Sequence, residues 1–126
     1  MITTPGSTIS AQCLTDAITD ETLGPWIDVR GRANLVFYVT GVSTTSSGVI
    51  TFEEAAPKNL SDAITPVVFG AGVGSYTAID TMNASDVSGG VQKAKHLTVG
   101  AYCFVRARIS TAIGGGGSVS VGLVAY

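Results

Sequence analysis

The chain has 126 residues and a formal net charge of −2, and only 13% of its residues are Asp, Glu, Lys or Arg. This charged fraction is about half of that in an average soluble protein, and the seven basic residues are scattered along the chain. A chain of this length fits one domain, and basic residues that are few and scattered give no electrostatic reason to bind nucleic acid.

The N-terminal region predicts an extended arm. Residues 1–11 are mainly Thr, Ser, Pro and Gly, with too few apolar side chains to pack by themselves, so we expect a neighbouring subunit to hold them. Residues 12–126 then form the folded domain. The chain has no apolar run long enough to span a membrane, and its first residues lack the regions of a secretory signal. We therefore expect neither a membrane-spanning protein nor one exported by its own signal.

Alternation of apolar and polar residues predicts the strands of the first half of the chain, because successive side chains of a strand point to opposite faces. These strands cover residues 12–15, 26–30, 35–40 and 49–54. Residues 16–23 predict one helical turn. Residues 35–40 are apolar on both faces, which is typical of a central strand. Residues 49–54 follow a polar loop and predict the hairpin partner of residues 35–40.

The second half of the chain predicts further short strands. They cover residues 67–69, 76–81, 101–110 and 118–126, with a helical turn at 60–65 and a mixed segment at 91–99. Four glycines at 114–117 separate the last two strands, which predicts a terminal hairpin whose turn passes close to another backbone. The apolar side of that hairpin needs a second sheet or a partner subunit over it. Seven or eight short strands predict an all-β, single-domain β-sandwich that is jelly-roll-like or a Greek key.

Catalytic and metal-binding motifs are weak. The glycine-rich residues 70–74 lead into an alternating segment instead of a long helix, so a flexible loop is favoured over a dinucleotide site. His96 is the single histidine, and no Cys-x-x-Cys, His-x-x-x-His or Gly-x-Ser-x-Gly spacing accompanies it. Glu53 and Glu54 are adjacent on a strand and point to opposite faces, which favours a solvated strand end over a glycosidase pair.

The two cysteines, Cys13 and Cys103, could form a disulfide, but Cys103 lies on the apolar face of its predicted strand, where a reduced thiol behaves as a small hydrophobe. A reduced pair is therefore favoured. We expect no catalytic residue, no cofactor and no metal.

A stripe of arginine and aromatic residues is the most distinctive side-chain pattern. Arg106 and Arg108 share a strand face with Tyr102 and Phe104, and such stripes contact proteins, sugars or bases. Three interpretations stay open: a subunit contact, an ion pair within the fold with Asp28 or Glu53, and a ligand site. The two chain ends add apolar residues that a small fold covers poorly. The candidate subunit or capsid contacts are Ile2, Ile9, Tyr102, Arg106, Arg108, Val124 and Tyr126.

The order of strands and turns is similar to that of a known family. The segments that carry the likeness are residues 26–31, 35–41, 48–54, 102–109 and 119–121, with the glycine turn between the last two. This pattern resembles the decoration or cement proteins of tailed bacteriophages, which are small β-sandwich proteins on the outer capsid surface. The resemblance implies a jelly-roll-like homotrimer that binds the major capsid protein and neighbouring copies of itself. It also implies a non-enzymatic virion component, made in the host cytoplasm, without nucleic-acid, membrane or small-molecule partners.

Two other classes of function stay open. A carbohydrate- or receptor-binding β-sandwich of a virion needs several exposed coplanar aromatic rings, and the core requires most of the one Trp, four Tyr and four Phe. A hydrolase needs an activated serine or two carboxylates about 5 Å apart.

Overall fold

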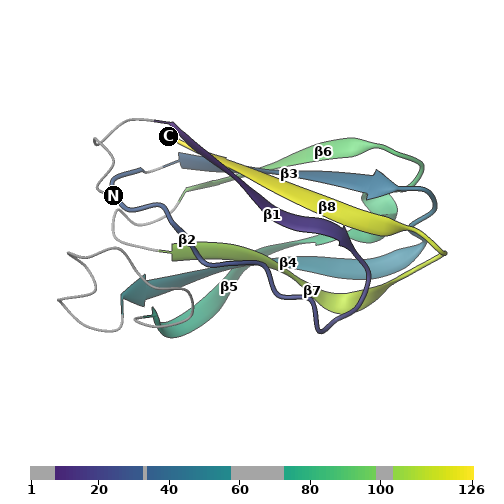
Figure 1. Ribbon diagram of the computed structural model, residues 1–126, viewed down its shortest axis with the longest axis horizontal. Helices are drawn as coiled ribbons and strands as arrows, with labels where there is room; N and C mark the ends of the chain where they lie inside the picture. The colour runs from purple at the N-terminus through teal and green to yellow at the C-terminus, as the bar shows by residue number, and fades with distance from the viewer. Residues whose placement is uncertain (1–7, 33, 58–72, 99–103) are drawn as a thin grey trace.

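The computed structural model describes residues 8–32, 34–57, 73–98 and 104–126 (Figure 1). Nearly all of its regular structure is β. The strands are β1 (Ile9–Ala17), β2 (Ile27–Asp28), β3 (Asn34–Val42), β4 (Ser47–Pro57), β5 (Val73–Asn83), β6 (Gln92–Thr98), β7 (Phe104–Gly114) and β8 (Ser118–Ala125). One 3₁₀ helix, η1 (Ala84–Val87), lies between β5 and β6. Among the described residues, no helix has the length and apolarity needed to cross a membrane.

The strands form two four-stranded sheets that lie against each other (Figure 1). Sheet A has the order β1-β8-β3-β6, and sheet B has the order β2-β7-β4-β5. The antiparallel pairs β4–β5, β3–β6, β2–β7 and β1–β8 are nested within one another along the chain. This nesting, folded over into two sheets, is the topology of an eight-stranded jelly roll. The predicted fold class is therefore confirmed.

The inner faces of the two sheets form one apolar core. The central strands alternate as their sequences predict, so that every second side chain is buried between the sheets. The core residues of these strands are Leu35, Phe37 and Val39 of β3; Ile50 and Phe52 of β4; Val105, Ala107 and Ile109 of β7; and Val119, Val121, Leu123 and Ala125 of β8. The side chains that remain for binding other molecules are on the outer faces, the edges and the loops.

Both predicted hairpins are wrong. β3 and β4 belong to different sheets, and so do β7 and β8. Alternation shows that a strand has one apolar face, but it does not decide whether the next strand pairs with it edge to edge or packs on it face to face. Here the apolar faces meet across the core, where the rings of Phe37 and Phe52 have centroids 4.6 Å apart.

The helical turn predicted at 16–23 is also wrong. β1 extends from Ile9 to Ala17, which includes part of the predicted arm, and the next residues then run beside β7. Backbone hydrogen bonds join Ile18, Thr22 and Gly24 to that strand. β2 pairs with only two residues of β7, so this irregular segment supplies partners that the edge of β7 would otherwise lack. Those tertiary hydrogen bonds outweigh the weak local preference for a helix.

The remaining sequence predictions have different outcomes. The strand predicted at 76–81 is confirmed within β5, and the mixed segment at 91–99 contains β6. The helical turn at 60–65 and the strand at 67–69 lie outside the described residues, as do residues 1–7 of the arm.

The glycine run at 114–117 makes the close approach that its composition predicts. It connects β7 to β8 and passes beside the connection from β3 to β4, where the backbone N–H of Ser46 donates to the carbonyl oxygen of Gly114 at 2.8 Å. A Cβ atom on Gly117 would collide with the carbonyl oxygens of Val42 and Thr44. The crossing from β3 to β4 and the crossing from β7 to β8 therefore pack directly on each other.

Replacing Gly117 by alanine tests this packing. We expect Gly117→Ala to lower the free energy of unfolding by about 2 kcal/mol or more, because backbone atoms and not flexible side chains must move. Gly116→Ala is the matched control. Gly116 has a φ of +87° but open space around its Cβ position, so it should cost only about 1 kcal/mol. Urea unfolding of both variants measures the difference, and equal losses would contradict the predicted collision.

Candidate interaction surfaces

The outer face of sheet A is almost uncharged. Paired residues of antiparallel strands share a face, so the register defines this surface. Its residues are Ser10 and Gln12 of β1; Asn34, Val36, Tyr38, Thr40 and Val42 of β3; Gln92, Ala94, His96 and Thr98 of β6; and Ser118, Ser120, Gly122 and Val124 of β8. Asp16, at one end of β1, accepts a hydrogen bond from Ser118 of this face, and the paired strand residues named above include no Asp, Glu, Lys or Arg.

A depression of about 360 Å³ lies on the outer face of sheet A, between β1, β3 and β8. Gly122 lies opposite Gln12 on one neighbouring strand and Tyr38 on the other. A Cβ atom on Gly122 would meet only the carbonyl oxygen of Ala11, at 3.8 Å, so the missing side chain leaves open space there. Tyr38, which is 39% exposed, and Val124 line the same depression.

The predicted contact residues at the chain ends lie in different places. Val124 is half-buried on the outer face of sheet A. Tyr126 is about half exposed, and its backbone exchanges two hydrogen bonds with Asn34. Ile9 is partly buried and packs against the core. Ile2 and Tyr102 lie outside the described residues. Contact of these residues with another subunit stays a prediction.

The outer face of sheet B, in contrast, holds a buried ion pair. Arg106 of β7 lies opposite Glu53 of β4, and its Nε donates to Glu53 Oε1 at 2.8 Å. The side chains of Arg106 and Glu53 are only 10% and 3% exposed. The Arg106 guanidinium also lies over the rings of Trp26 and Tyr76, 4.4 and 4.8 Å from their centroids. Of the three interpretations, the structure thus shows the ion pair within the fold for Arg106.

The expectation that Glu53 lies at a solvated strand end is wrong. Its carboxylate is buried because the register of β4 and β7 places two guanidiniums beside it. Arg108 is the second of these, with Nε 3.1 Å from the same Oε1 atom. The N–H of Arg108 is not aligned for a hydrogen bond, and this Nε is the one buried side-chain nitrogen or oxygen of the described residues without a hydrogen-bond partner.

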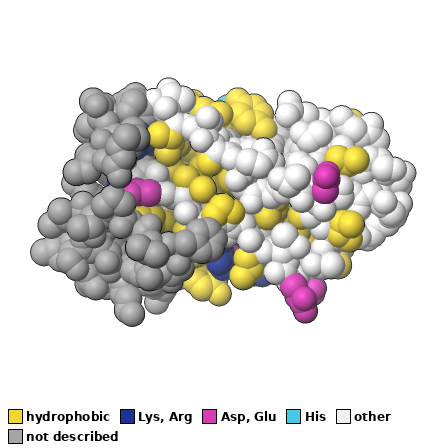
Figure 2. Space-filling model, viewed as in Figure 1, with side chains coloured by type: hydrophobic (Ala, Val, Ile, Leu, Met, Phe, Trp, Pro, Cys, Tyr) yellow, Lys and Arg dark blue, Asp and Glu magenta, His cyan; other side chains and the backbone are white. Residues whose placement is uncertain are grey.

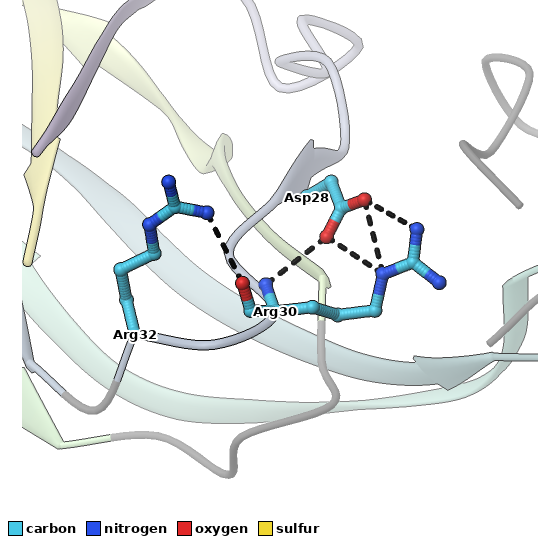
Figure 3. Close-up of polar contacts among 3 residues, drawn as sticks. All are labelled: Asp28, Arg30 and Arg32. Carbon is cyan, nitrogen blue, oxygen red and sulfur yellow. Dashed lines mark hydrogen bonds and ion pairs between the residues drawn. The ribbon is translucent and has the colours of Figure 1, made fainter. Parts of the chain in front are cut away.

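Asp28, the other partner considered for Arg106, is taken by Arg30 (Figure 3). Arg30 donates from Nη2 to Asp28 Oδ2 at 2.6 Å and from Nε to both carboxylate oxygens at 2.9 and 3.0 Å. The backbone N–H of Arg30 donates to Asp28 Oδ1 as well. Arg32 donates from Nη1 to the carbonyl oxygen of Arg30 at 3.1 Å, and the Arg30 guanidinium lies 5.2 Å from the centroid of Phe104. This cluster fixes the chain beyond β2.

Burial or neighbouring donors shift the pKa values of two titratable groups outside these clusters. Cys13 is a free thiol, and burial raises its pKa to about 12, so the reactive thiolate is scarce at neutral pH. Cys103 lies outside the described residues. The backbone N–H of Thr81 and the nearby Lys95 ammonium lower the pKa of Asp80. No three His, Cys, Asp or Glu side chains of the described segments converge as a metal site.

Two solved structures share the fold of the chain. PBSX exported protein XepA has 18% sequence identity and a TM-score of 0.55, over 94% of this chain and 37% of XepA. SPBc2 prophage-derived protein YomS has 16% identity and a TM-score of 0.53, over 99% of this chain and 96% of YomS. The chain therefore spans little more than a third of XepA but nearly all of YomS. No protein-family model and no curated protein sequence matches the chain. At these identities, the likeness shows a shared fold.

Neutralising Glu53 tests the buried ion pair. We expect Glu53→Gln to lower the free energy of unfolding by about 3 kcal/mol, because it leaves the nearly buried Arg106 guanidinium without its counter-ion. The neighbouring Glu54→Gln, at a partly exposed position, should change stability by less than about 0.5 kcal/mol. Guanidinium chloride is unsuitable because its ions screen the pair, so urea unfolding at neutral pH is the measurement. A loss for Glu53→Gln no larger than that of the control would show that the pair is dispensable.

Proposed function

We propose that the chain is a non-enzymatic structural protein of a bacteriophage virion, which binds the outer capsid surface and stabilises the shell as a decoration or cement protein. The observation that carries the proposal is the nearly uncharged outer face of sheet A. The fold that the chain shares with a prophage-derived protein supports it further, as does the resemblance of its strand and turn pattern to decoration proteins.

The residues of this face suit contact with another protein surface. Burying an unpaired charge costs several kcal/mol, whereas hydroxyl, amide and aliphatic groups lose much less when water is excluded. Tyr38 and Tyr126 are exposed, and tyrosine is enriched in protein interfaces. In the view of Figure 2, which takes in both sheets, the charged side chains of the described residues are few and separate. The face can therefore be covered without leaving a buried charge.

The occupant that we propose for this face is the major capsid protein. A capsid presents the same site many times, so that linked copies hold the shell firmly even when each single contact is modest. In the proposal, neighbouring copies of the chain join as a homotrimer through residues 1–7, and each copy lays the outer face of sheet A on the shell.

The carbohydrate-binding alternative is less well supported. Trp26 and Tyr76 are the aromatic pair on the outer face of sheet B, with ring centroids 5.9 Å apart and planes inclined by 57°. Sugar platforms use rings with a free flat face, and the Arg106 guanidinium already lies over both of these rings. We therefore retain the capsid-binding role.

Introducing a charge on the proposed capsid-binding face is the direct test. We expect Tyr38→Glu to fold normally, since Tyr38 is exposed, and to weaken binding to capsids that lack the protein by about tenfold or more. Thr81→Glu, at an exposed position on β5 of the other sheet, is the matched control and should bind like the unaltered chain. Co-sedimentation with the particles measures both. Equal binding of the two variants would remove the outer face of sheet A from the proposal.

Removing the N-terminal residues tests how copies associate. Deletion of residues 1–7 stops before β1, because Ile9 already pairs with Ala125. We expect the truncated chain to keep its melting temperature but to lose the trimer in analytical ultracentrifugation and to occupy capsids more weakly. An unchanged oligomeric state together with unchanged occupancy would show that the arm takes no part.

A further inference from the structure

Two guanidiniums share one carboxylate on the outer face of sheet B. Arg106 and Arg108 both lie beside Glu53, while Arg30 binds Asp28. The cluster around Glu53 therefore has an excess of one positive charge.

The two arginines that share Glu53 differ in what they can do. Arg106 is enclosed, since its guanidinium is covered by two aromatic rings and its side chain is only 10% exposed. Arg108 is 32% exposed, and its Nε lies close to the Glu53 carboxylate without a hydrogen bond. That Nε is buried against Glu53 and out of reach of another molecule, so a ligand would meet the exposed remainder of the side chain. Arg108 is thus the arginine of this cluster that can still bind another group.

The neighbourhood of Arg108 suits a protein partner. Leu23 forms a backbone bridge opposite Arg108, and its side chain is more than half exposed. Tyr76, which contacts the other side of the cluster through Arg106, is more than half exposed as well. Arginine and tyrosine are both enriched at the energetic hot spots of protein interfaces.

We propose that Arg108 anchors an acidic side chain, Asp or Glu, of a partner polypeptide on the outer face of sheet B. A carboxylate matches the planar guanidinium edge in a two-point contact, and its single negative charge neutralises the excess of the cluster. Leu23, which pairs with Arg108, then covers the apolar atoms beside the carboxylate. This surface lies on the opposite side of the sandwich from the face assigned to the capsid, so the site goes beyond the proposed function and does not depend on it.

The carboxylate site can be tested with a small probe on the whole chain. The probe is N-acetyl-glutamic acid amide, and N-acetyl-glutamine amide is its neutral isostere. Arginine Nε–Hε resonances in two-dimensional NMR report on each guanidinium separately. We expect the acidic probe to shift the Arg108 resonance along a saturable single-site curve, and the neutral probe at the same ionic strength to leave it in place.

Variants separate this site from a general effect of charge. Arg108→Lys keeps the charge but loses the planar fork, so backbone amide shifts around β7 should show binding weakened by about tenfold. Lys93→Gln removes one positive charge from β6 in the other sheet and should bind the acidic probe unchanged. Equal shifts with both probes, or equal affinity in Arg108→Lys and the unaltered chain, would overturn the proposal. If Arg108→Lys does not fold, the comparison of the two probes on the unaltered chain decides alone.

Discussion

The stacking of Phe37 on Phe52 is the contact on which the rest of the structure depends. Both rings are fully buried, and they come from strands that are consecutive in the chain but lie in opposite sheets. Because these apolar faces are buried against each other, the chain must cross between the sheets after β3, and the crossing after β7 lies beside that one. The two crossings pack together through Ser46 and Gly114. The nested strand pairing of the jelly roll follows from this choice of face-to-face over edge-to-edge contact.

Closing the core in this way leaves two outer faces with different chemistry. The outer face of sheet A has almost no charge and has the depression at Gly122. The outer face of sheet B carries ion pairs and arginines that lie over aromatic rings. The cost of desolvating charges makes the first face the easier one to cover with another protein surface, whereas the second favours a partner that brings a compensating negative charge. The proposed functions of the two faces follow from that difference.

Much of the fold can be predicted from the sequence, because alternation is a local property. Residues 35–40, 49–54 and 119–125 bury the side chains that their pattern indicates. The pairing of strands is not local, and a glycine-rich connection is compatible with a hairpin and with a crossing between sheets. For the same reason the sequence offers Glu53 as one of two ion-pair partners for Arg106 but does not predict its burial, since Arg106 is 53 positions away and only the register brings them together. Of the candidate contacts, Val124 and Tyr126 could be identified as poorly covered from their place at the chain end, whereas the depression over Gly122 required three strands to be placed side by side.

The orientation of the molecule on a virion tests the account most directly. Cryo-electron microscopy of particles that carry the protein would show which surface meets the shell. We expect density for the jelly roll on the outside of the capsid, with Tyr38 and the depression at Gly122 turned toward the capsid protein. A molecule whose sheet A outer face points to solvent, or one bound away from the capsid surface, would contradict this orientation.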